Sequence, residues 1–229
     1  MQRTARLLAV TLTSFAVAAL VASCATTPST GPMGFFITSV NPGNGGNLGG
    51  LAGADAHCQK LASVAGAGNR TWRAYLSTNF VPPSTAAVHA RDRIGKGPWF
   101  NAKGVLIASD VAQLHGANNL NKQTALTEKG GVVNGRGDTP NMHDILTGSR
   151  PDGTAYPAYP GQPNLSCGDW TREANAFAAV GHHDRLEKWS GAADPWADSW
   201  NSSHLTVSCS KEDLPKSGGA GLFYCFAAD

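Results

Sequence analysis

The densest group of titratable side chains in the sequence is Gly181-His182-His183-Asp184-Arg185, and His204 follows further along the chain. Imidazole nitrogens and carboxylate oxygens bind zinc, and three such ligands with one open position make a catalytic zinc site. We therefore take His182, His183, Asp184 and His204 as candidate metal ligands. The alternative is an exposed polar turn, because adjacent histidines point in different directions and no His-Glu-x-x-His spacing supports them.

Aromatic side chains near this segment are candidates for binding a sugar or a peptide. Tyr156 and Tyr159 belong to a stiff, extended Tyr-Pro-Ala-Tyr-Pro segment, and Trp200 is close in sequence to Trp189 and Trp196. Aromatic rings stack on sugars, but in a loop-rich fold tryptophans more often fill the core beneath a loop. The sequence leaves both alternatives open.

Motifs for nucleophilic catalysis and for nucleotide binding are absent or incomplete. The chain has no Gly-x-Ser-x-Gly elbow, and Ser208-Cys209-Ser210-Lys211 has Ser-x-x-Lys spacing without the Ser-Asp-Asn and Lys-Thr-Gly motifs that accompany it. The glycine-rich stretch 41–50 lacks the spacing that directs backbone amides at phosphates. The sequence therefore identifies no catalytic residue and no nucleotide site.

Four of the five cysteines lie in the part of the chain that reads as a folded domain, at positions 58, 167, 209 and 225. Four cysteines allow three pairings. We favour the nested one, Cys58 with Cys225 and Cys167 with Cys209, in which the outer bridge ties the first helix to the last strand. Disulfides persist in exported proteins, so this composition predicts an oxidising compartment.

The first residues have the pattern of an export signal. Arg3 and Arg6 precede an apolar run, which ends in Val21-Ala22-Ser23-Cys24. This tetrapeptide resembles a bacterial lipobox, in which the cysteine is lipidated. We therefore expect a signal peptide at 1–23, a lipidated Cys24, a flexible tether over 24–34 and a domain over 35–229. An ordinary signal peptide, with Cys24 removed or left as a stray thiol, is the alternative. By the sorting preference known for such lipoproteins, Ala25 suggests the outer membrane.

The charge balance is nearly even, with 18 Lys and Arg against 16 Asp and Glu. Removal of Arg3 and Arg6 with the signal peptide leaves 16 of each sign. A strongly basic face is therefore not implied, and nucleic acid is an unexpected partner. The roughly 195 residues after the tether suffice for one well-buried domain.

Apolar periodicity predicts the elements that must position these residues. We expect strands at 35–40 and 72–77, a helix at 51–65 and a hairpin that turns at 101–104. An alanine-rich stretch at 172–180 suggests a short helix, and 222–226 reads as the last strand. Residues 109–165 read as a loop-rich stretch and include Arg136-Gly137-Asp138, an integrin-binding tripeptide that often occurs by chance.

The order of these pieces resembles a bacterial family of secreted or lipid-anchored domains of unknown function. That family looks like endostatin and, more distantly, the C-type lectin-like fold. The resemblance covers most of residues 35–229 and implies an α+β domain with paired N- and C-terminal strands and the same nested disulfides. It implies no assigned activity. It is carried by Gly53–Cys58, Trp72–Ser77, Ala90–Ile94, Gly97–Trp99, Ile145–Ser149, Asp152–Thr154, Cys167–Thr171 and Leu222–Phe226.

Two further pieces are similar to the calcium motifs of C-type lectins, Gln162-Pro163-Asn164 and Trp200-Asn201-Ser202. Calcium binds six to eight oxygen ligands, and the resemblance assigns Asn164 and Asn201 to that role. Ser202, however, stands where the lectin motif has an aspartate, and the spacing to the cysteines also departs. Ordinary turn chemistry of proline and asparagine is the alternative.

These observations predict a non-catalytic binding module at the cell surface, held to the membrane by a lipid anchor, for a glycan or protein ligand. The alternatives are a metal-dependent enzyme that uses the cluster at 182–184, and a purely structural envelope protein. Zinc and calcium are the two cofactors that the candidate ligands allow.

Overall fold

The structure, a computed structural model, describes residues 30–79, 86–157, 163–185 and 199–229. The strands of this part of the chain form one six-stranded sheet of order β1-β8-β5-β6-β7, in which β2 also pairs with β8, and a two-stranded sheet. The large sheet contains β1 (Phe35–Ile37), β2 (Trp72–Ala74), β5 (Asp144–Leu146), β6 (Ala179–His182), β7 (His204–Leu205) and β8 (Gly219–Ala227). The small sheet contains β3 (Trp99–Phe100) and β4 (Leu106–Ala108), and the helices are α1 (Gly50–Val64), α2 (Val111–Leu114), α3 (Cys167–Trp170) and α4 (Leu214–Ser217).

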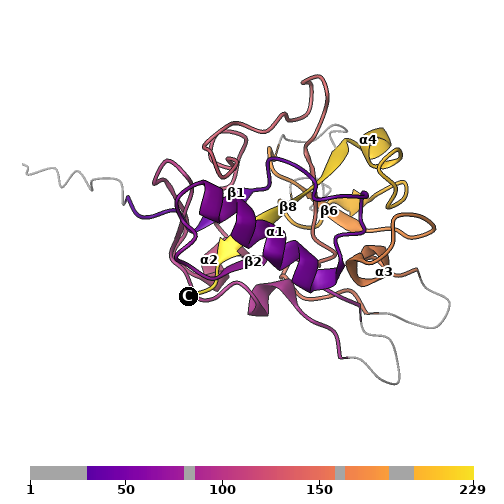
Figure 1. Ribbon diagram of the computed structural model, residues 1–229, viewed down its shortest axis with the longest axis horizontal. Helices are drawn as coiled ribbons and strands as arrows, with labels where there is room; N and C mark the ends of the chain where they lie inside the picture. The colour runs from indigo at the N-terminus through magenta and orange to yellow at the C-terminus, as the bar shows by residue number, and fades with distance from the viewer. Residues whose placement is uncertain (1–29, 80–85, 158–162, 186–198) are drawn as a thin grey trace, which may run out of the picture.

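The long strand β8 organises the domain, because its side chains alternate between two hydrophobic cores. Phe223 and Cys225 face the core that contains α1, together with Phe36 of β1. Tyr224 and Phe226 face the opposite core, which the β3–β4 hairpin and several loops cover. Figure 1 shows α1 lying across the sheet beside β2 and β8. The domain is therefore a sheet with α1 on one face and mostly irregular chain on the other.

Both disulfides of the nested pairing are confirmed. Cys58 of α1 is bonded to Cys225 of β8, with 5.6 Å between their Cα atoms. Cys167 is bonded to Cys209, with a Cα–Cα distance of 5.8 Å. The pairing of β1 with β8, antiparallel with Phe36 opposite Cys225, also confirms that the first and last strands are neighbours. The structure thus bears out a mixed α and β domain with few helices and two disulfides.

A buried ion pair fixes α1 against the sheet. Asp55 of α1 is 8% exposed and lies 2.7 Å from an Nη2 of Arg93 and 2.8 Å from an Nη1 of Arg73. The backbone N–H of Ala74 in β2 donates a third hydrogen bond to this carboxylate, at 2.9 Å. Each oxygen of Asp55 therefore has a partner, as a buried charge requires.

One expectation about the second half of the chain was wrong. The stretch 172–180, expected to be a short helix, instead runs into β6, which pairs with β5 on one side and β7 on the other. Residues 109–165, expected to be loop-rich, have the short elements α2 and β5 among mostly irregular chain in their described part. Local helix propensity is weak, and pairing on both edges of a strand overrides it.

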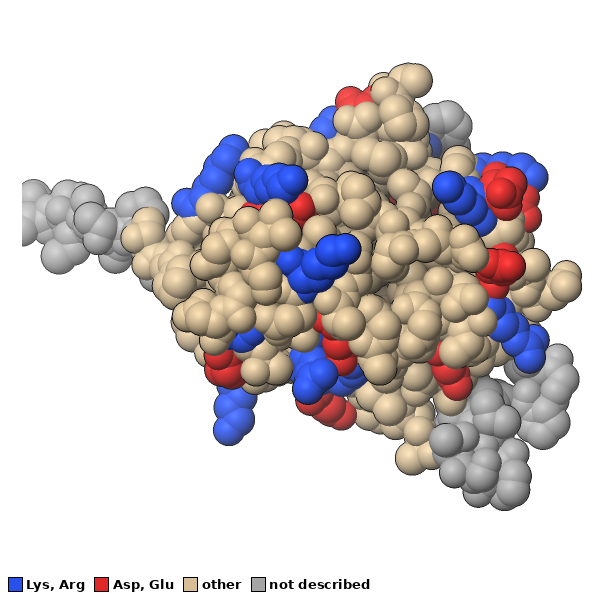
Figure 2. Space-filling view, in the orientation of Figure 1, with Lys and Arg blue, Asp and Glu red and all other residues tan. Residues whose placement is uncertain are grey.

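The two ends of the described chain lie together. Thr30 and Met33, in the segment expected to be tether, form bridges with Val105 and Phe100. Arg70 contacts the carbonyl of Met33 and the carboxylate of Asp229, which brings the N-terminal segment beside the C-terminus. Figure 1 shows this end of the molecule opposite α3 and α4. On the face in Figure 2, basic and acidic side chains are interspersed over a largely uncharged surface.

Candidate metal centre

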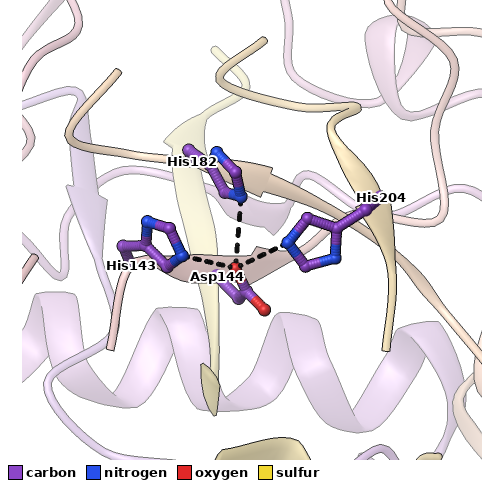
Figure 3. Close-up of side chains that lie close together, drawn as sticks. All are labelled: His143, Asp144, His182 and His204. Atoms are coloured by element: carbon purple, nitrogen blue, oxygen red, sulfur yellow. Dashed lines mark ion pairs between the residues drawn. The ribbon is translucent and has the colours of Figure 1, made fainter. Parts of the chain in front are cut away.

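Three histidines and one aspartate converge where β5, β6 and β7 lie side by side (Figure 3). His143 directly precedes β5, Asp144 begins β5, His182 ends β6 and His204 begins β7. One ligand atom from each residue lies within 4.8 Å of the others. Among the described residues, this is the group of His, Cys, Asp and Glu side chains that could hold a metal ion.

The strand register explains why residues so far apart in sequence meet. Asp144 is directly opposite His182 in the antiparallel β5–β6 pair, so the two side chains share one face of the sheet. His204 is opposite Val180, two residues before His182, which makes His204 a diagonal neighbour on the same face. The side chains of the cluster therefore lie together on one face of the sheet and make one end of that face polar.

Two of the four metal ligands expected from the sequence belong to this centre, and two do not. His182 and His204 are in it, whereas His183 points the other way, because successive side chains of a strand alternate. His183 is fully buried, with Nε2 3.1 Å from the carbonyl oxygen of Asn134. Asp184 contacts the centre indirectly, 3.5 Å from Nδ1 of His143.

The distances suit a small tetrahedral ion. Oδ1 of Asp144 lies 3.1 Å from Nε2 of His143 and 3.3 Å from Nε2 of both His182 and His204. Zinc–nitrogen and zinc–oxygen bonds of about 2.0–2.1 Å place tetrahedral ligand atoms roughly 3.3–3.4 Å apart. Each carboxylate–imidazole separation is within a few tenths of an ångström of that value, and the four ligand atoms all lie within 4.8 Å of one another, so the imidazoles would move toward one another to close on an ion.

In His143 and His204, Nδ1 faces an oxygen acceptor, and this determines which protonation state Nε2 has where it faces Asp144. Nδ1 of His204 is 3.0 Å from the carbonyl oxygen of Leu205, and Nδ1 of His143 faces the Asp184 carboxylate. A proton on Nδ1 of His204 makes a hydrogen bond to that carbonyl, a proton on Nδ1 of His143 lies toward Asp184 without hydrogen-bond geometry, and Nε2 then carries the lone pair of each neutral ring. The Nε2 lone pairs of these two rings then point at the anionic carboxylate of Asp144. Because these groups repel one another, a proton or a metal cation is required between each nitrogen and the carboxylate.

Burial and charge both act on this cluster. The side chain of Asp144 is 1% exposed, and neither of its oxygens has a hydrogen-bond partner among the described residues. Burial alone would raise the pKa of Asp144, but the contacts with the three imidazoles hold it below its usual range. Burial would lower the pKa of His143, yet its contacts with Asp144 and Asp184 raise it to about 9. The contact with Asp144 also raises the pKa of His204, against the effect of burial.

Glycines allow the backbone to approach the centre closely. A Cβ atom at Gly181, just before His182, would lie 1.9 Å from the carbonyl oxygen of Trp200. Gly218 has φ of +102°, and a Cβ there would lie 3.0 Å from Nε2 of His143. Only a residue without a side chain fits either position, so these glycines are part of what packs β6 and His143 into place.

The residues expected to bind a calcium ion or a sugar are occupied by internal contacts. Trp200 is 4% exposed and packs against Tyr75, with ring centroids 4.8 Å apart. The side-chain amide of Asn201 donates to the hydroxyl of Tyr75 and to the carbonyls of residues 150 and 151. These contacts fill the core beneath a loop, the alternative that the sequence left open for Trp200.

The remaining candidates divide between internal contacts and undescribed positions. Asn164 accepts from the backbone N–H groups of Ser166 and Gly168, which stabilises the left-handed turn around Gly168. The hydroxyl of Tyr156 is 2.8 Å from that of Ser202. Tyr159 and Cys24 lie outside the described residues.

The integrin-like tripeptide lies close behind the metal centre. The carboxylate of Asp138 accepts the N–H of Gly135 at 2.8 Å and forms an ion pair with Lys122. The backbone N–H of Arg136 donates to Oδ2 of Asp184 at 2.6 Å. Asp138 is therefore engaged in its own turn, and this segment contacts the centre through Asp184.

Sequence reasoning missed His143 and Asp144. The signal that pointed to them was a titratable pair directly before the apolar run Ile145-Leu146, which reads as the start of a buried strand. Their pairing with β6 could not be inferred, because β5 is parallel to β8 and antiparallel to β6 across long connections.

No helix among the described residues is long and apolar enough to span a membrane. Comparison with known proteins gives no assignment, since no family model and no curated protein matches this chain.

Proposed function

We propose that this protein is an exported, lipid-anchored binding module whose fold is clamped at one end by a zinc ion. The ion would be held by His143, Asp144, His182 and His204. The observation that carries this proposal is the convergence of three imidazole Nε2 atoms on a buried carboxylate whose oxygens lack hydrogen-bond partners in the described chain.

The donor set favours zinc over calcium. Calcium takes six to eight oxygen ligands, whereas this centre offers three nitrogens and one carboxylate. Imidazole suits zinc, copper, nickel and iron, and a mixed set of three imidazoles and one carboxylate satisfies tetrahedral zinc. Zinc is the choice within that group because it is bound in proteins almost always by four nitrogen, sulfur or carboxylate ligands, the number and kind that this centre offers.

Four protein ligands support a structural rather than a catalytic ion. A structural zinc site is closed by four protein ligands, whereas a catalytic site keeps one position for water. A metal-dependent hydrolase is the second candidate, and one observation favours it. The side chain of His204 is 38% exposed, so a metal bound there would be accessible from solvent on that side.

The binding role rests on the position of the centre. A metal ion would cross-link β5, β6 and β7 and hold the connections between them, and loops on a rigid scaffold are where binding surfaces form. The described N-terminal segment lies at the opposite end of the molecule (Figure 1), so a lipid anchor would leave the metal-bearing end facing away from the membrane. The ligand class remains a glycan or a protein, and the C-type lectin-like fold is the fold we propose for this arrangement.

Elemental mass spectrometry on the full chain, oxidised and purified without chelator, tests the proposal. We expect about one zinc per chain, and His204→Ala should reduce zinc to background. His57→Ala is the matched control, because His57 lies on α1 and contacts the carbonyl of Val40, outside the centre. Stoichiometric calcium in place of zinc, or no metal in the wild-type protein, would refute the zinc clamp.

A further inference from the structure

Asp184 is a buried carboxylate that links two parts of the molecule. Its side chain is fully buried, with Oδ1 3.5 Å from Nδ1 of His143, an ion-pair separation at which neither atom makes a hydrogen bond among the described residues. Its Oδ2 accepts the backbone N–H of Arg136 at 2.6 Å. A Cβ atom on Gly135 would lie 2.6 Å from the same oxygen, so the chain approaches Asp184 as closely as a glycine permits. One carboxylate thus contacts both a metal-site imidazole and a separate loop.

The contact with His143 selects a tautomer. A carboxylate accepts hydrogen bonds and cannot donate them, so Asp184 favours the ring form with a proton on Nδ1. That form presents Nε2 toward Asp144, which is the direction that metal binding needs. Carboxylates that hold metal-binding imidazoles in this way commonly contribute 10- to 100-fold in metal affinity, as an order of magnitude.

The second oxygen holds a loop that we define as the 134–138 loop, Asn134 to Asp138. This loop is tied to the sheet by the Arg136 contact and by His183, whose Nε2 lies near the carbonyl of Asn134. Asp138 closes the loop on itself through the N–H of Gly135. Asp184 therefore contacts His143 through one oxygen and the 134–138 loop through the other.

We propose that Asp184 is the positioning residue of the metal centre and that it couples metal occupancy to the order of the 134–138 loop. This inference rests on the proposed zinc clamp. An ion on Nε2 of His143 fixes the ring with Nδ1–H directed at Asp184, and the carboxylate is then held in the position from which it accepts the Arg136 N–H. The loop is then more ordered in the metal-bound protein than in the metal-free protein.

The test compares zinc titrations and hydrogen exchange of the full chain for wild type, Asp184→Asn and a control. The asparagine oxygen can still accept from Arg136, but the amide N–H₂ cannot accept from His143, so the substitution targets the tautomer. We expect zinc affinity to fall roughly 10- to 100-fold, measured on variant protein that is folded in chelator. We also expect zinc to slow exchange at Arg136 in wild type only.

Asp110→Asn is the control, because Asp110 caps α2 through the N–H of Gln113 and asparagine caps equally well. Equal zinc affinity in Asp184→Asn and wild type would overturn the inference and leave the clamp standing. If the wild-type protein does not bind zinc, both the inference about Asp184 and the zinc clamp are refuted. If Asp184→Asn does not fold, ¹⁵N shifts of His143 in zinc-loaded wild type decide the matter. A protonated Nδ1 supports the inference, and a metal-bound Nδ1 refutes it.

Discussion

Asp55 of α1 and Asp144 of β5 are two buried carboxylates, and their surroundings differ in kind. Asp55 meets two arginines and a backbone N–H, and each of its contacts has hydrogen-bond geometry. Asp144 meets three imidazoles at similar distances, yet neither of its oxygens makes a hydrogen bond within the described chain.

The difference lies in what each partner can do. Arginine is always charged and always a donor, so the Asp55 pair is complete without any other group. Imidazole can lose its proton and become a ligand, so the Asp144 cluster is stable either with protons or with a metal ion. The comparison separates a carboxylate that fixes a helix from one that is arranged to hold a cation, although both are almost fully buried.

The largest expected effect comes from making the same substitution at both carboxylates. Asp55→Asn leaves Arg93 buried without a charged partner, and we expect it to cost about 3–5 kcal/mol of unfolding free energy, with or without zinc. Asp144→Asn should cost less than half as much in metal-free protein and should abolish stabilisation by zinc. Urea unfolding with chelator or with zinc measures both. Equal losses for the two variants under chelator would contradict the comparison.

An intermediate effect is expected for the exposed ligand of the centre. Saturating zinc should stabilise the wild type by about 2.7 kcal/mol when free zinc is about 100 times its Kd. His204→Ala should lose this gain while changing metal-free stability by no more than about 0.5 kcal/mol, because its side chain is partly exposed and lies on an edge strand. Thermal unfolding with and without zinc checks this. A zinc-dependent gain that survives in His204→Ala would exclude His204 as a ligand.

The smallest effect is the pH dependence of the metal-free protein. The folded-state pKa of His143 is raised to about 9 from an ordinary value of 6.5. Stability from this group is therefore fully present below about pH 6.5 and is lost as pH rises through about 9. Denaturant midpoints measured in chelator at pH 6 and pH 9 should show this loss in wild type and a smaller loss in Asp144→Asn, in which Asp184 still faces His143. A flat profile in wild type would show that His143 does not retain its proton.

Several structural elements of the domain were predicted from local patterns in the sequence. The helix at α1, the β3–β4 hairpin and the last strand were predicted from apolar spacing, and the nested disulfides were confirmed. One pattern misled, because the alanines before β6 suggested a helix. Two questions that the sequence left open were decided by the fold: of His182 and His183 only His182 joins the centre, and Trp200 fills the core. In each case a strand partner or a buried neighbour decided the outcome.

The sequence by itself determined which side chains are available and how they alternate along each strand. Because the side-chain period of a strand is two, Phe223 and Cys225 face the opposite side of the sheet from Tyr224 and Phe226. For the same reason His182 and His183 point in opposite directions. Only the tertiary structure decided that His143 and Asp144 complete the metal centre. That choice depends on the register of β5 with β6 and of β6 with β7, which is set by packing between segments some 40 residues apart in the first case. No local propensity encodes such a pairing, because its free energy is gained only once both strands lie in the same sheet.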